Sequence, residues 1–148
     1  MESINTAIQT IDTNQAPAPP GPFSHVAIVG PWVYTSGMGG LDPETGELVS
    51  DDVIEQTEQA IRNIQAILAA VGCTLQDVVK CVVYLTDMAD YVRVNTMYGR
   101  AFAPHKPART CVAVSALPVR ERMKMDCIAY RRGEQRGHLL GCSGAICC

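Results

Sequence analysis

Residues 107–130, PARTCVAVSALPVRERMKMDCIAY, predict two β-strands, at about 108–115 and 122–131, on which both the fold and the site depend. In the second strand, Lys124 and Asp126 alternate with two methionines and a cysteine. Because successive side chains of a strand point to opposite faces of a sheet, we expect both charged groups on one face.

Arg109 lies at the start of the first of these strands. Its planar guanidinium group is suited to holding a carboxylate through two parallel hydrogen bonds. Only about six residues separate the two strands, so antiparallel pairing between them would bring Arg109 near Lys124 and Asp126. One interpretation is a binding site for a small acidic molecule. The other is a solvated sheet face that carries a Lys/Asp ion pair.

Outward from this stretch, the chain predicts an α+β fold, with a mostly antiparallel sheet and two helices on one face. The most regular element is an amphipathic helix over about 53–71, where apolar residues recur every three and four positions ahead of Gly72. The other predicted elements are a second helix that begins near Asp87 or Asp90 and ends near Phe102, strands at 7–11, 24–29, 32–38 and 78–85, and a proline-rich irregular segment at 14–22. Since helices would cover only one face of this sheet, we expect oligomerisation to cover the other.

Length and composition favour one small cytoplasmic domain. We expect residues 1–132 to form a single domain and residues 133–148, which have no periodicity, to form a flexible tail. A net charge of −3 without a basic stripe argues against nucleic acid as a partner, and no apolar run approaches the ~20 residues that span a membrane. The seven cysteines form no C-x-x-C pair and the three histidines are scattered, so we expect reduced thiols, no metal and no other cofactor.

Ordered motifs run from about residue 7 to residue 132: APAPPGPFS (16–24), VYTSG (33–37), LDPETGELV (41–49), DVVK (77–80), YLTDMAD (84–90), PART (107–110) and LP (117–118), with Gln56, Thr57, Asn63, Ile64, Val94, Asn95 and Tyr98 between them. In these motifs the chain resembles the RidA family of enamine/imine deaminases, also called the endoribonuclease L-PSP family. The resemblance implies a chorismate-mutase-like fold and a homotrimer with ligand clefts between subunits. It also implies a 2-iminobutanoate/2-iminopropanoate deaminase-like hydrolase, which converts 2-enamines or 2-imines of short 2-oxo acids to the oxo acid and ammonia.

The resemblance also implies roles for individual residues. Arg109 would hold the substrate carboxylate, and Cys111 and the backbone of Ser36 and Gly37 would line the cleft. Phe23 stands where the family usually has a tyrosine. Asn95 and Tyr98 fall on motif positions near the subunit interface, for which helix packing is the alternative explanation; they complete the expected substrate-binding set.

One position departs from the family pattern. Lys124 stands fifteen residues after Arg109, where the family has a glutamate that positions the attacking water, and Asp126 keeps a carboxylate two residues later. A protonated lysine accepts no hydrogen bond and cannot act as a base. Three interpretations remain: hydrolytic deamination with Lys124 and Asp126 as the catalytic pair, a pathway-specific tautomerisation or cyclisation that uses Arg109 and Lys124, and a non-catalytic trimer that binds carboxylate metabolites.

Overall fold

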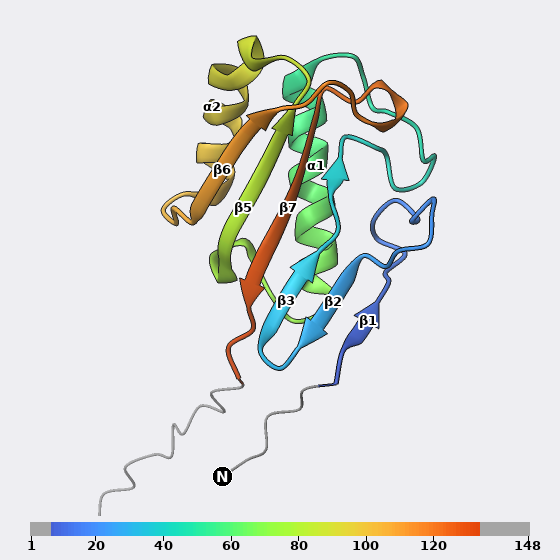
Figure 1. Cartoon of the computed structure of the whole chain (residues 1–148), viewed down its shortest axis with the longest axis vertical. Coiled ribbons are helices and arrows are strands. Elements are labelled where there is room, and N and C mark those ends of the chain that lie inside the picture. The colour runs from blue at the N-terminus through green and yellow to red at the C-terminus, as the bar shows by residue number, and fades with distance from the viewer. Residues whose placement is uncertain (1–6, 134–148) are drawn as a thin grey trace, which may run out of the picture.

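Among residues 7–133, a seven-stranded sheet is covered on one face by two helices (Figure 1). The structure is a computed structural model and describes residues 7–133; the predicted tail lies outside the described residues from 134 onward. The strands follow the order β1-β2-β3-β7-β5-β6, and β4 also pairs with β7. They are β1 (Gln9–Ile11), β2 (Val26–Val29), β3 (Trp32–Thr35), β4 (Met38–Gly39), β5 (Val78–Leu85), β6 (Ala108–Ala113) and β7 (Met123–Tyr130).

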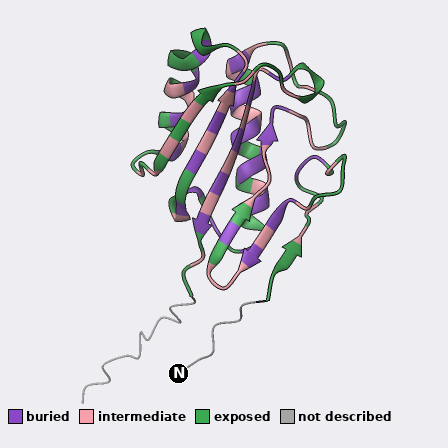
Figure 2. Ribbon diagram, in the orientation of Figure 1, coloured by how far each residue is buried: buried purple, intermediate pink, exposed green. Residues whose placement is uncertain are grey.

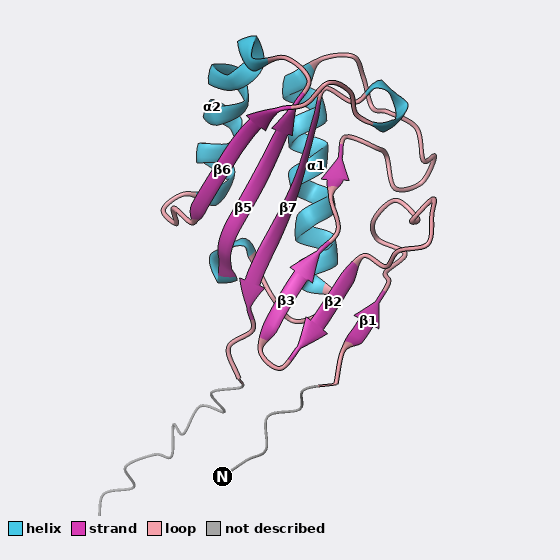
Figure 3. Ribbon diagram, viewed as in Figure 1, coloured by secondary structure: helices cyan, strands magenta, loops and turns pink. Residues whose placement is uncertain are grey.

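The pairing of β6 corrects the prediction from sequence. All neighbouring strands are antiparallel except β5 and β6, which are parallel, with Cys81 opposite Arg109 (Figure 3). We expected the strand that contains Arg109 to pair with β7, but β5 lies between them. Helix α2 accounts for the difference, because it returns the chain to the end of the sheet at which β5 began. The α+β class with a mostly antiparallel sheet is confirmed.

Helix α1 (Val53–Ala69) occupies the predicted amphipathic segment. The Asp52 side chain caps its first turn by accepting hydrogen bonds from the backbone N–H groups of Ile54 and Glu55, as an N-cap residue should. The chain leaves the helix at Gly72, whose φ of +77° is a conformation that favours glycine. The face toward the sheet is buried and includes Val53, Ala60, Ile61, Ile64, Ile67 and Leu68.

Helix α2 (Tyr91–Phe102) follows a short 3₁₀ helix (Met88–Asp90) and packs beside α1. Its buried residues Val94, Tyr98 and Phe102 are spaced by four, so they share one face. The rings of Tyr98 and Phe102 stack with their centroids 4.4 Å apart. None of the helices among residues 7–133 is long and apolar enough to cross a membrane.

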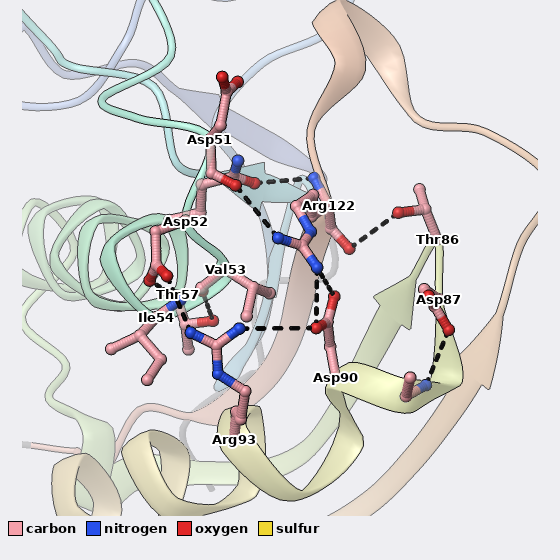
Figure 4. A network of polar contacts seen from close by, with 12 residues as sticks. Asp51, Asp52, Val53, Ile54, Thr57, Thr86, Asp87, Asp90, Arg93 and Arg122 are labelled. Atoms are coloured by element: carbon pink, nitrogen blue, oxygen red, sulfur yellow. Dashed lines mark hydrogen bonds and ion pairs between the residues drawn. The ribbon is translucent and has the colours of Figure 1, made fainter.

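A polar network joins the starts of both helices to the segment before β7 (Figure 4). One guanidinium nitrogen of Arg122 donates to both carboxylate oxygens of Asp90, at 2.9 and 2.8 Å, and the other donates to the Asp51 carbonyl at 3.2 Å. Arg93 contributes an exposed ion pair to Asp52, 2.8 Å long. Residues far apart in the sequence therefore fix where the chain enters β7.

The two faces of β7 differ as its alternation predicts (Figure 2). Met123, Met125 and Cys127 are at most 1% exposed and face the helices. Lys124 and Asp126 are partly exposed and share the other face, which none of the helices within the described part of the chain covers. The apolar residues on or beside that open face include Trp32, Tyr34, Val112 and Tyr130, each about two-fifths exposed.

Candidate functional site

Arg109 is held against helix α2 by two tyrosines. Its register partner on β5 is the buried Cys81, which places Arg109 on the helix-covered face of the sheet. The guanidinium carbon lies 4.8 Å from the ring centre of Tyr98 and 5.7 Å from that of Tyr91, and one nitrogen donates to the Tyr91 hydroxyl at 3.3 Å. Within residues 7–133 no carboxylate forms an ion pair with Arg109. Its position suits capture of an external anion.

Two buried polar groups near Arg109 are poorly satisfied within the described chain. The Asn95 side-chain oxygen has no hydrogen bond to residues 7–133, and the Tyr98 hydroxyl has the Cys81 thiol, a weak hydrogen-bonding group, beside it. Burial raises the pKa of the Tyr98 hydroxyl, so this group is a neutral donor at physiological pH. Unsatisfied buried polar atoms are costly, which indicates a ligand or a second subunit at this surface.

Cys111 follows Arg109 on the same face of β6 and is half-buried. Burial raises the pKa of its thiol, and the nearby positive charge of Arg109 opposes this only in part. The thiol is therefore protonated near neutral pH and has little nucleophilic character. Its position agrees with a residue that lines a site.

Lys124 lies at a second location, beside a cavity of about 160 Å³. Its ammonium nitrogen is 3.0 Å from a carboxylate oxygen of Glu121, a side chain that is only 1% exposed. Gly37 and Gly39 pack against this pair: a Cβ on Gly37 would lie 3.0 Å from the lysine chain, and one on Gly39 would overlap the glutamate carboxylate. Elsewhere the cavity wall is mainly apolar and includes Pro17, Pro20, Phe23, Leu41, Pro118 and Val119.

Ser36 and His25 hold the loop that carries Phe23 beside this cavity. The Ser36 hydroxyl donates to the Ser24 carbonyl at 2.6 Å, and its backbone N–H donates to the His25 carbonyl at 2.8 Å. The His25 ring accepts from the Thr13 N–H at Nδ1, so its Nε2 carries the hydrogen and donates to the Pro17 carbonyl at 2.8 Å. Phe23 itself is 46% exposed and forms part of the cavity mouth.

Asp126 lies further along the open face of β7. It accepts a hydrogen bond from the Tyr84 hydroxyl at 3.0 Å. Burial, and then this bond to Asp126, raise the pKa of Tyr84. The carboxylate therefore has a partner within its own chain, on the strand next to β7.

A single chain does not bring Arg109 together with Lys124 and Asp126. Arg109 faces helix α2, whereas the other two lie on the opposite face of the sheet, with β5 between their strands. Our expectation of a convergence within one subunit is wrong because it assumed the antiparallel pairing corrected above. The structure instead separates an Arg109 surface, with Asn95, Tyr98 and Cys111, from a Lys124 cavity, with Phe23, Gly37 and Glu121.

Glu121 is the residue that reasoning from sequence missed. It stands between Arg120 and Arg122, in a segment that reads as an exposed charged turn. A signal was present in its spacing, because it precedes the anomalous Lys124 by three residues and has the charge that the family pattern expects there. Its burial depends on Gly39, which is distant from it in the sequence, and on Pro118, which lies in an irregular turn.

The sequence and the fold are both similar to known proteins. Residues 13–131 match the family described as Endoribonuclease L-PSP. The 2-iminobutanoate/2-iminopropanoate deaminase of Mus musculus is 42% identical over 123 residues, which cover 83% of this chain and 91% of the mouse protein. Crystal structures of RidA from the Antarctic bacterium Psychrobacter sp. PAMC 21119 (TM-score 0.80, 43% identity, 82% and 98% coverage) and of E. coli TdcF with bound serine (TM-score 0.80, 34% identity, 84% and 99% coverage) have the same fold.

Proposed function

The chain belongs to the Endoribonuclease L-PSP family, to which RidA and the imine deaminases also belong, and we propose that it deaminates the 2-imine, or the 2-enamine tautomer, of a 2-oxo acid. The observation that carries this proposal is the guanidinium of Arg109, which lies over the Tyr98 ring and has no ion-pair partner among residues 7–133. Such a group is ready to hold the carboxylate of a 2-imino acid. E. coli TdcF, which has the same fold, binds serine, and serine is likewise a small molecule with a carboxylate next to a nitrogen-bearing carbon.

The reaction is a hydrolysis. The oxygen of water bonds to the imine carbon, the nitrogen leaves as ammonia and the carbon becomes the carbonyl of a 2-oxo acid. Arg109 fixes the carboxylate end of the substrate, while Cys111 and the backbone of Ser36 and Gly37 line the cleft. Asn95 and Tyr98 offer an acceptor and a donor at the same surface.

We further propose that the working protein is a homotrimer with its clefts between subunits. Two features support this. The open sheet face carries the half-exposed apolar side chains of Trp32, Tyr34 and Val112, which a second copy would cover. Arg109 and Lys124 lie on opposite faces of the sheet, so a ligand that contacts both must take them from different subunits.

Lys124 favours a second candidate function. A lysine beside an apolar cavity is suited to protonate carbon or to stabilise an enolate, as in a tautomerisation or a ring closure on an enamine carboxylate. Such a reaction would consume the same class of labile substrate without releasing ammonia.

Ammonia release distinguishes these candidates. 2-Iminobutanoate is generated in situ by an amino-acid oxidase, and its decay is followed by semicarbazide trapping together with ammonia production. We expect the purified protein to accelerate ammonia release well above the spontaneous rate. Consumption of the imine without ammonia release would support the non-hydrolytic reaction. If the protein did not change the rate of imine decay, it would be a carboxylate-binding protein without this catalytic activity.

A further inference from the structure

We propose that Glu121 supplies the carboxylate that activates water in this chain, within the cavity beside Lys124. The inference rests on the deamination proposed above and adds a catalytic residue to it. The carboxylate would have moved from position 124 to position 121, three residues earlier, while remaining at the same site. Lys124 then acts as a positioning residue that holds Glu121.

The first support is the environment of the Glu121 carboxylate. The side chain is 1% exposed and lies on the wall of the cavity. One oxygen forms an ion pair with the Lys124 ammonium at 3.0 Å, but neither carboxylate oxygen has a hydrogen-bond partner within residues 7–133. A buried carboxylate oxygen without a partner is costly, so its retention beside a cavity indicates that a water molecule or a substrate contacts it.

The second support is the backbone that turns Glu121 inward. Val119 and Arg120, immediately before it, have φ angles of +50° and +59°, which β-branched and bulky residues rarely adopt. Strain of this kind persists where the surrounding structure determines the conformation, and it concentrates at functional sites. The next N–H, that of Arg122, donates to the side chain of the fully buried Gln56 at 2.7 Å, which fixes the chain on the other side of Glu121.

Gly39 provides the space for the carboxylate. A Cβ at this position would lie 2.5 Å from the Glu121 carboxyl carbon and would overlap one of its oxygens. The Asn63 side chain holds this part of the chain in place by donating to the carbonyls of Gly39 and Leu41, at 3.0 and 2.9 Å. The site is therefore built from β4, helix α1 and the turn before β7, rather than by a single flexible side chain.

Asp126, the other carboxylate on β7, is less suited to this role. It already accepts a hydrogen bond from Tyr84 and is not among the residues that line the cavity. Glu121, by contrast, shares the cavity wall with Phe23 and Gly37, two of the residues expected to contact substrate.

The proposed step balances in atoms and charge. As the water oxygen bonds to the iminium carbon, the π electrons of the C=N bond move to nitrogen and the water proton passes to Glu121. Glu121 returns that proton to the nitrogen of the carbinolamine. The C–N bond then breaks as the remaining hydroxyl forms the carbonyl, and its proton passes through Glu121 to the departing ammonia. The products are a 2-oxo acid and ammonium, and Glu121 is again a carboxylate.

The test compares Glu121→Gln with the wild type, using ammonia release from in situ 2-iminobutanoate and the affinity for 2-oxobutanoate measured by calorimetry. We expect Glu121→Gln to lower kcat by at least about 100-fold, the usual range for a lost acid–base group, with affinity changed less than about 3-fold. Glu44→Gln, an exposed glutamate outside the cavity, is the matched control and should retain wild-type rates. Thermal unfolding of each variant checks that the buried substitution preserves the fold.

Rescue within the cavity separates a catalytic carboxylate from a structural one. The double variant Glu121→Gln with Lys124→Glu restores a carboxylate three residues away. We expect its kcat to be at least about 10-fold higher than that of Glu121→Gln. Suppose that the wild type is active. If Glu121→Gln were equally active, or if Asp126→Asn lost more activity than Glu121→Gln, the assignment of Glu121 would be overturned while the proposed deamination would stand. A wild type that releases no ammonia would overturn the proposed deamination and this inference together.

Discussion

A guanidinium held over an aromatic ring by a cation–π contact keeps N–H groups for other partners, and Arg109 is held in this way by Tyr98, with one nitrogen donating to Tyr91. At the residue scale, the function therefore depends on geometry as well as on charge. Lysine retains the positive charge but presents a single ammonium group and cannot form two parallel bonds to a carboxylate. The same reasoning distinguishes Arg109 from Lys124, which already pairs with Glu121.

Arg109→Ala is expected to reduce the affinity for 2-oxobutanoate by about 30-fold or more, since truncating one partner of a hydrogen-bonded charge pair costs about 2–5 kcal/mol. Arg109→Lys should recover only a small part of that loss. Calorimetric titration provides the measurement, and Arg62→Ala, on the exposed side of α1, provides the control. If Arg109→Ala bound the ligand as tightly as the wild type, the carboxylate would have to bind elsewhere.

At the scale of elements, the position of β7 relative to both helices depends on Arg122 and Asp90. Asp90 is 4% exposed, so its carboxylate relies on the arginine for hydrogen bonds. The pair between Arg93 and Asp52 joins the same two helices, but both of its side chains are more than two-fifths exposed. Arg93 also approaches Asp90, but only at 3.9 Å, compared with 2.8 Å for Arg122. Exposed pairs contribute little to stability, whereas loss of a partner for a buried charge is strongly destabilising.

We therefore expect Arg122→Ala to lower the free energy of unfolding by about 2–3 kcal/mol and Arg93→Ala by less than about 1 kcal/mol. Urea denaturation of the two variants, side by side, measures the difference. Because Arg122 directly follows Glu121, its loss should also reduce ammonia release, while Arg93→Ala should not. Equal destabilisation by the two substitutions would contradict the role given to Asp90.

At the scale of the whole molecule, helices cover one face of the sheet (Figure 1), and the other face of the described chain carries exposed aromatic and aliphatic side chains. An apolar face of this kind is the usual signature of an interface between copies. In the proposed trimer, this contact would also bring the Arg109 surface of one subunit to the Lys124 cavity of the next. Assembly and activity should then be lost together.

Sedimentation velocity should show a trimer for the wild type and smaller species for Val112→Arg, because a charge would be buried on the open face. Ammonia release should fall in parallel with the loss of trimer. Val92→Arg provides the control, since Val92 is 71% exposed on helix α2, away from that face. A monodisperse, fully active monomer would rule out a site shared between subunits.

The amino-acid sequence by itself determined the elements whose signal is local. The 3.6-residue period identified helix α1, alternation placed Lys124 and Asp126 on one face of β7, and the run 78–85 coincided with β5. Ordered motifs spread over most of the chain identified the family. These features follow from neighbouring residues, and tertiary contacts only reinforce them.

Only the tertiary structure decided which strand pairs with β6 and what surrounds Glu121. Strand pairing depends on how a crossover helix packs and on which faces are buried together, and this information is spread over residues 78–130. The burial of Glu121 requires Gly39 to leave space and Gln56 to hold the next N–H, at sequence separations of 82 and 66 residues. A charged turn between two arginines gives no local sign of such contacts, because burial is a property of the assembled fold.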